Sequence, residues 1–140
     1  NFKLGLPIGK RPGQTQSEPQ LVEAFYSGQT LTMLKNHVTA IENIWYGRSK
    51  DGVDGIGFRE YLESVEGGNA LISSTETQLA ALKTALAAVP ESPSIAAQIS
   101  SAPAPLEALY VEFSKTTRYF KSDLSSLLGI AITFSSGDGD

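Results

Sequence analysis

Apolar side chains recur every three or four residues through the segment 105–129, and this spacing constrains the fold more than any other feature of the chain. The spacing places them on one face of an α-helix, where they must be buried against another element. Gly129 follows at the point where a helix C-cap needs a residue that can adopt a positive φ. The predicted apolar stripe consists of Leu106, Leu109, Phe113, Thr117, Phe120, Leu124 and Leu127.

A second stripe runs through residues 29–47. It predicts a helix of about five turns, at roughly 3.6 residues per turn, that ends at Gly47. Ser27 or Thr30 is the expected N-cap, because a hydroxyl can accept a hydrogen bond from a free backbone N–H of the first turn. The residues of this stripe are Leu31, Leu34, Val38, Ile41 and Trp45.

A third stripe, in residues 69–90, follows a seven-residue repeat. Two starts of this helix are open: Asn69 as N-cap, or a capping box formed by Ser73 and Glu76. Pro90 follows the expected end of the helix, which suits a residue that cannot continue a helical ladder. The repeat consists of Ile72, Thr75, Leu79, Leu82, Leu86 and Val89.

Shorter segments connect these long helices. Residues 58–66 predict a short helix that ends at two consecutive glycines, whereas residues 48–57 contain loop signals. Residues 91–105 are rich in Ser, Ala and Pro, and we expect a connection there in which Ile95 and Ile99 dock through one helical turn.

The sequence therefore predicts an all-α fold, because three long helices and one short helix must bury their stripes against one another. An up-and-down bundle achieves this. Residues 1–20 are expected to form an irregular strap or linker from an upstream half, and residues 21–140 the bundle. After the last helix, Ile130, Ile132 and Phe134 alternate with smaller residues and predict an extended tail.

Composition excludes several classes of function. The chain has 140 residues, enough for one domain with a core. Its net charge is −4 and its basic residues are scattered, so we expect no nucleic-acid partner. The lack of cysteine excludes disulfides and thiolate sites. No apolar run reaches the roughly 18–20 residues of a membrane span. Because the chain begins at Asn1 without a signal peptide, we expect a piece of a longer protein.

His37 is the only histidine in the chain. With Glu42 it forms the spacing H-x-x-x-x-E, which separates the two side chains by about 140° around a helix with about 100° per residue. Metal ligands on a helix favour spacings of three or four, as in H-E-x-x-H. We therefore interpret His37 as a half-buried or surface side chain, with a role at an interface as the alternative.

Carboxylates offer the other candidate chemistry. Asp138 and Asp140 lie one residue apart in a glycine-rich ending and could chelate a hard cation, although a polar tail is more often simply solvated. Glu60, Glu63 and Glu66 repeat at three-residue spacing, which predicts a solvated acidic face or, alternatively, a weak cation site. The chain shows no G-x-S-x-G elbow, P-loop or dinucleotide fingerprint.

Three stretches together resemble the C-terminal half of the imelysin-like family, also classified as the M75 peptidase family. The first is LGLPIGK followed, after a gap, by YSGQTLTMLKNHVTAIENIWYG, and the second is DGIGFREYLE. The third is the ending LSSLLGIAITFSSGDGD, similar to a family terminus of the form LG-(V/I)-x-(I/L)-x-F-…-D-G-D. The resemblance covers essentially the whole chain in the order and spacing of these motifs.

The resemblance implies an all-helical protein of two bundle-like halves in the bacterial envelope, periplasmic or attached to the outer membrane, often as a lipoprotein. It implies a link to iron uptake or, alternatively, a metallopeptidase. The G-x-H-x-x-E motif of the family belongs to the other half. Here Lys35 and Ala40 occupy the Gly and Glu positions around His37. No catalytic residue is therefore assigned, and whether the protein is an enzyme stays open.

Site residues also follow from the resemblance. Tyr26, Ser27 and Gly28 are expected to bind a cofactor or ligand beside a cleft, and Asp138 and Asp140 to bind metal. The cofactor would be iron or zinc, held mainly by the missing half. The expected partner is the N-terminal half of the same protein, with a metal or small ligand between the halves.

One further prediction concerns the surface of this chain. We expect an exposed apolar surface, because the strap residues Phe2, Leu4 and Leu6 and the tail residues 130–134 have little else to pack on.

Overall fold

The computed structural model describes residues 3–131, and within them it contains helices, turns and irregular segments but no strand. The all-α prediction is confirmed. The elements are η1 (Pro19–Leu21), α1 (Thr30–Tyr46), α2 (Phe58–Leu62), α3 (Gly68–Ala87), α4 (Ile95–Ser101), α5 (Ala104–Arg118), η2 (Tyr119–Leu124) and α6 (Ser125–Leu128).

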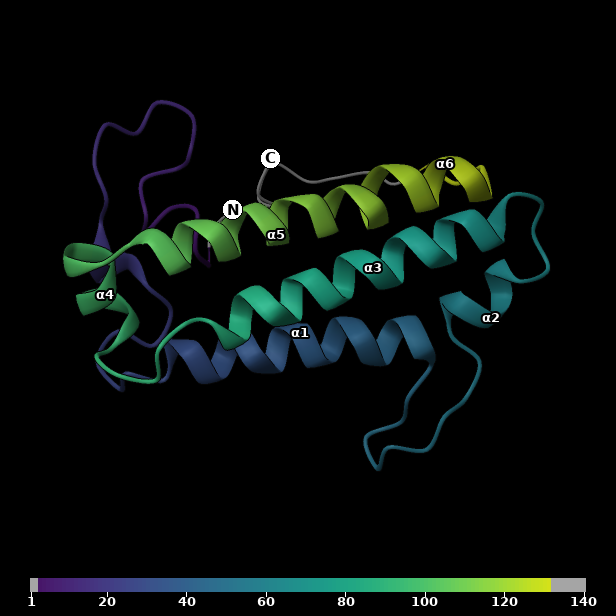
Figure 1. The fold of residues 1–140 in the computed structure, drawn as a ribbon, viewed down its shortest axis with the longest axis horizontal. Helices are drawn as coiled ribbons and strands as arrows, with labels where there is room; N and C mark the ends of the chain where they lie inside the picture. Colours follow the sequence, from purple (N-terminus) through teal and green to yellow (C-terminus); the bar gives the residue numbers. More distant parts are fainter. Residues whose placement is uncertain (1–2, 132–140) are drawn as a thin grey trace.

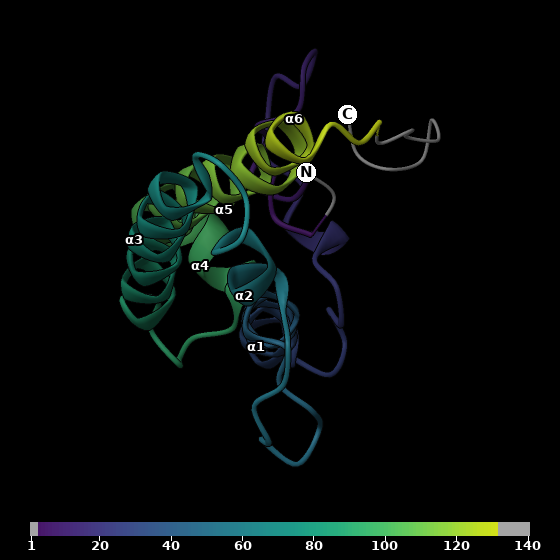
Figure 2. The same ribbon diagram turned by 90° about the vertical axis from the view of Figure 1, so that its right-hand side faces the viewer.

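The three long helices α1, α3 and α5 run alternately in opposite directions, as the up-and-down prediction required (Figure 1). The short helix α2 joins α1 to α3 at one end of the bundle, and α4 joins α3 to α5 at the other. Figure 2, which looks along the bundle, shows the long helices at the corners of a triangle. No helix in the described part of the chain is long and apolar enough to cross a membrane.

The predicted apolar stripes face the interior. All six residues of the stripe of α3 are buried, including Val89 just beyond the helix. In α1 the stripe is buried except at Ile41, which is half-buried. Periodicity predicted these two helices well because the buried residues of each recur at helical spacing.

The interior is divided into two hydrophobic clusters along the bundle. The first joins the strap, the first half of α1, the end of α3, α4 and the start of α5. The second contains Trp45, Leu62, Ile72, Leu79 and Leu124 and lies near α2 and α6.

Ile95 and Ile99 belong to the first cluster, so α4 is a docked helix as predicted, with Ser94 as its N-cap. The expectation that Leu4 is exposed is wrong: it is 3% exposed and belongs to the same cluster. The strap folds back here, with the Ile8 N–H donating to the Leu4 carbonyl. Phe2 lies outside the described residues, and the domain boundary at residue 20 stays a prediction.

The predicted helix ends at Gly47 and Gly129 are confirmed, whereas α2 ends at Leu62 and not at the two glycines, and the predicted start of α1 is wrong. Gly47 and Gly129 take the left-handed conformation at φ 66° and 63°. The helix α1 follows Gln29, which makes no side-chain cap. The hydroxyl of Ser27 donates to the Ala24 carbonyl instead, and that of Thr30, the first helical residue, donates back to the Glu23 carbonyl.

The start of α3 also differs from both predictions. The helix begins at Gly68, before Asn69 and Ser73, because a tight turn from α2 precedes it. Gly67 has φ 79°, and a Cβ on Gly68 would lie 1.9 Å from the Leu62 carbonyl oxygen. Only a glycine at this position lets the two helices approach so closely.

The last helix is interrupted by the π-helix η2, which periodicity did not reveal. Its predicted stripe is wrong at one position: Thr117 is exposed and Thr116 is buried. The reason is that α5 packs chiefly on α3. There the Thr116 hydroxyl accepts a hydrogen bond from Gln78 Nε2 at 3.4 Å.

Candidate functional site

A groove with a volume of about 230 Å³ lies between α1 and the α5–η2 helix. Three of its lining residues come from α1, three from α5 and two from η2, and four of the eight have large apolar side chains. They are His37, Ile41, Ile44, Phe113, Thr116, Thr117, Phe120 and Lys121.

The α1 wall of the groove is a second line of side chains beside the buried stripe. His37, Ile41 and Ile44 succeed one another at four- and three-residue steps, so they share one face of the helix. Opposite them, Phe120 is fixed by an edge-to-face contact with the buried Trp45, at 5.8 Å between ring centroids and 82° between planes. The aromatic floor is therefore tied to the second hydrophobic cluster.

His37 lies at the rim of the groove, with its ring centroid 6.0 Å from that of Phe113. Burial and, to a lesser extent, Lys3 hold the pKa of His37 below its usual 6.5, and Glu23 opposes this shift. The imidazole is therefore neutral at pH 7. Neutral imidazole and the two phenyl rings make the groove suitable for flat apolar groups, whereas Lys121 supplies a cation at one side.

A second hollow of about 300 Å³ continues the apolar surface past the end of α1. It shares Ile44 with the groove and adds Ile56, Phe58, Tyr61 and Leu128. Ile44 is 60% exposed and Ile56 is 87% exposed. This is not the apolar surface expected from the sequence: of the residues that predicted it, Leu4 is buried and Ile130 is 49% exposed, but neither lines this hollow.

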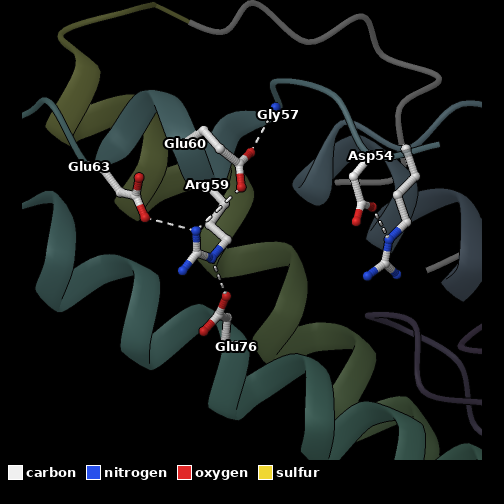
Figure 3. Close-up of polar contacts among 7 residues, drawn as sticks. Asp54, Gly57, Arg59, Glu60, Glu63 and Glu76 are labelled. Carbon is white, nitrogen blue, oxygen red and sulfur yellow. Dashed lines mark hydrogen bonds and ion pairs between the residues drawn. The ribbon is translucent and has the colours of Figure 1, made fainter.

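The acidic residues of α2 have a structural role. Figure 3 shows Arg59 at the centre of three carboxylates, from Glu60, Glu63 and Glu76. Its Nε lies 2.9 Å from Glu76 Oε1, and its Nη1 lies 2.8 Å from Glu63 Oε1 and 3.3 Å from Glu60 Oε1. Two of the three glutamates predicted to form a solvated acidic face, Glu60 and Glu63, thus pair locally with Arg59, and Arg59 ties α2 to α3 through Glu76.

Glu60 also holds the start of α2. Its Oε2 accepts a hydrogen bond from the Gly57 N–H at 2.9 Å (Figure 3), and this bond is the main reason that the pKa of Glu60 lies below its usual value. A Cβ on Gly57 would lie 2.3 Å from Gly47 N and from Trp45 O. The glycine-rich motif that resembles the family is therefore explained by this close backbone approach, and Gly57 also lines the second hollow.

The predicted site residues lie away from the groove or outside the described residues. Tyr26 is fully exposed, and Gly28 has φ 67° with open space around its Cα. With Ser27 they form the turn before α1, and none of them lines the groove. Their role in binding stays a prediction. Asp138 and Asp140 lie outside the described residues.

No metal-ligand cluster is formed within residues 3–131, where no group of three or more His, Asp or Glu side chains could hold a metal ion. The groove itself was missed by the sequence analysis. Periodicity places Phe113, Phe120 and Ile41 in the core, against which all three are packed, but does not indicate that they also line a groove with Ile44. The available signal was the second apolar line on α1, with His37 at its border.

The family assignment rests on residues 1–111, which match the family model described as imelysin, peptidase M75. Because this match covers more than half of the chain, the protein belongs to the imelysin (peptidase M75) family. The terminal motif that resembles the family, residues 124–140, lies beyond the match. No curated protein and no solved structure matches the chain.

Proposed function

We propose that this chain is the ligand-binding half of a bacterial envelope protein of the imelysin family, linked to iron uptake. In this proposal the protein is periplasmic or attached to the outer membrane. The groove between α1 and α5 forms one wall of a cleft, and the N-terminal half of the same protein forms the other. The apolar groove is the observation that carries the proposal.

The size and chemistry of the groove support a wall rather than a complete pocket. Its volume of about 230 Å³ is below the roughly 300–1,000 Å³ of typical ligand sites. Its apolar lining continues into the second hollow through Ile44, which provides a surface for a larger ligand or for the other half. Phe113 and Phe120 suit a flat apolar group, and Lys121 suits an anionic substituent.

The alternative is a metallopeptidase, which the family description as peptidase M75 favours. The groove would then hold apolar side chains of a peptide substrate. The metal and the general base would come from a G-x-H-x-x-E motif outside this chain, because His37 lacks the Gly and Glu neighbours of that motif. Chelator-sensitive cleavage of an unstructured peptide by a form with both halves would favour this alternative.

An apolar anionic dye, 8-anilinonaphthalene-1-sulfonate, tests the groove directly in the 140-residue chain. Thr117 and Thr77 are both exposed helical threonines whose hydroxyls donate to the carbonyl four residues earlier, but only Thr117 lines the groove. We expect Thr117→Asp to weaken dye binding about tenfold, equal to about 1.4 kcal/mol, and Thr77→Asp to leave it unchanged. Equal affinities of the two variants would exclude the groove as the site.

Metal binding is tested separately by calorimetric titration of Fe(III) and Zn(II). Saturable heat that disappears in the double variant Asp138→Asn with Asp140→Asn would assign a metal site to the terminal carboxylates. Saturable heat that survives this change would place the site elsewhere in the chain. A silent titration of this chain, with binding by a form that has both halves, would place the metal outside this half.

A further inference from the structure

His37 gives the groove a single good metal-donor atom. The lining of the groove contains no carboxylate, thiol or thioether beside this imidazole. Imidazole nitrogen is a common protein ligand of iron, copper and zinc. The groove therefore offers one coordinating nitrogen in apolar surroundings, and not a set of ligands.

The imidazole of His37 is available to a ligand. Its side chain is exposed at the rim of the groove, and neither ring nitrogen makes a hydrogen bond within residues 3–131. Because burial lowers the pKa of His37, the ring is neutral at pH 7 and one nitrogen keeps its lone pair. A metal that enters the groove thus meets a nitrogen that is ready to coordinate it.

The threonines of the groove add little to this nitrogen. The Thr116 hydroxyl donates to the Glu112 carbonyl at 2.8 Å, and the Thr117 hydroxyl donates to the Phe113 carbonyl at 2.9 Å. A bare iron ion needs several donor side chains, such as two imidazoles and a carboxylate. A metal that already carries most of its ligands needs only one more. The lining of the groove suits the second kind of metal.

The walls of the groove favour a flat chelate. Ile41 and Ile44 follow His37 on the same face of α1, about 6 Å and 10 Å along the helix at about 1.5 Å per residue. Across from them, Phe120 is held edge-to-face by the buried Trp45. The imidazole thus stands at one end of a slot whose two walls are apolar. A planar aromatic ring system can place one edge in such a slot and its metal beside the imidazole.

We propose that the groove binds a planar iron chelate of the tetrapyrrole class, with a ring nitrogen of His37 as an axial ligand of the iron. Four nitrogens of the chelate fill the plane around the metal, so the protein supplies only the axial nitrogen, as a proximal histidine does for haem. The imidazole lone pair replaces a water or hydroxide on the iron, and no electron is transferred. The apolar edge of the chelate lies between Ile41 and Phe120. The choice of iron rests on the proposed function.

Iron(III) protoporphyrin IX and metal-free protoporphyrin IX, titrated into the 140-residue chain, test the coordination. We expect His37→Ala to weaken binding of the iron form by about tenfold or more, as loss of a metal ligand should, and to leave the metal-free form unchanged. Free imidazole added to this variant should restore the absorption spectrum of the native complex. Equal affinities of the native chain and His37→Ala for the iron form would overturn the proposal.

A displaced histidine is the matched control. Asn36 is exposed, precedes His37 and does not line the groove. Asn36→His combined with His37→Ala moves the imidazole by about 100° around α1. We expect this variant to bind the iron form as weakly as His37→Ala alone. Recovery of the native affinity would mean that any surface histidine suffices, which overturns the proposal.

The metal-free porphyrin separates this inference from the proposed function. Binding of both porphyrins that is weakened by Thr117→Asp, but not by Thr77→Asp or His37→Ala, would refute the coordination and leave the groove as the binding site. Binding of the iron form that requires His37 but is unchanged in Thr117→Asp would place the chelate outside the groove. Absence of any groove-dependent binding, of porphyrin or of dye, would refute both proposals.

Discussion

The two sides of α5 are built very differently. Toward α3, Leu109 and Leu82 are completely buried, and Gln78 Nε2 donates to the Glu112 carboxylate at 2.8 Å and to the Glu112 carbonyl at 3.2 Å. Toward α1, Thr117 is exposed and a groove of about 230 Å³ stays open. One helix thus stabilises the fold with one side and leaves an apolar surface available with the other.

This difference separates residues for folding from residues for binding. Each fully buried leucine on the α3 side contributes about 1.5–3 kcal/mol to folding. Aromatic rings on the α1 side keep part of their apolar surface in water. A ligand or partner that buries this remaining surface gains a favourable hydrophobic free energy of binding. Substitutions on the two sides should therefore change different observables, namely the free energy of unfolding and the affinity for apolar probes.

The largest expected effect is on the packed side. Leu109→Ala should lower the free energy of unfolding by about 2–5 kcal/mol, because it removes buried methyl groups and leaves a cavity. Val111→Ala, at an exposed position of the same helix, should change it by less than about 0.5 kcal/mol. Urea denaturation measures both. Similar losses in the two variants would mean that α5 is not packed as described.

The next effect concerns the loop that packs against the end of α1 and lines the second hollow. Gly57→Ala should cost about 1–3 kcal/mol, since its Cβ would meet backbone atoms that cannot move aside. Gly52→Ala is the control: no atom lies within 4 Å of its Cβ, and only its φ of 76° is unfavourable, at about 1–2 kcal/mol. If Gly57→Ala unfolded at the same midpoint temperature as the native chain, the close approach of Gly57 to the backbone of Gly47 and Trp45 would be contradicted.

A smaller effect is expected at the polar contact between α3 and α5. Gln78→Leu should cost about 1 kcal/mol, because its hydrogen bonds to Glu112 are lost while Lys115 and Thr116 still bond to Glu112. The side chain of Gln78 also bonds to Thr116, so a double-mutant cycle with Thr116→Val should show coupling of about 0.5 kcal/mol or more. Strict additivity would show that the hydrogen bond between Gln78 and Thr116 contributes nothing to stability.

The smallest effect is the pH dependence due to His37 on the open side. Its pKa is lowered in the folded state, so the unfolded state binds more protons as the pH falls toward and below 6.5. The native chain should lose slightly more stability than His37→Gln between pH 7.5 and 5.5. Urea denaturation at several pH values measures this. A larger loss of stability in the variant would mean that folding does not lower the pKa of His37. That result would contradict the described environment of His37.

Much of the fold could be predicted from the sequence because each long helix has an apolar stripe, and Gly47 and Gly129 mark the ends of the first and the last. The helix starts could not, since Gln29 and Gly67 precede their helices without a capping side chain. The π-helix η2 also gave no signal, because Phe120 and Leu124 keep a four-residue step through it. Local patterns thus located elements but not their irregular turns.

The candidate site was less predictable for a physical reason. A groove residue and a core residue share the same apolar chemistry, and only the packing of neighbouring helices decides between them. Phe113 and Phe120 pack against the hydrophobic clusters, as their spacing predicts, and also line the open groove. The residues chosen by resemblance, Tyr26, Ser27 and Gly28, lie in a turn outside it.

The central claim is that the α1–α5 groove is the binding surface of this chain, and the single imidazole of His37 provides the most direct test. We would follow its ring signals by NMR while 8-anilinonaphthalene-1-sulfonate is added to the native chain. The account predicts a saturable shift of the His37 signals with the same affinity as dye fluorescence, and a loss of both in Thr117→Asp. Saturable fluorescence without any movement of the His37 signals would place the binding surface elsewhere and contradict the claim.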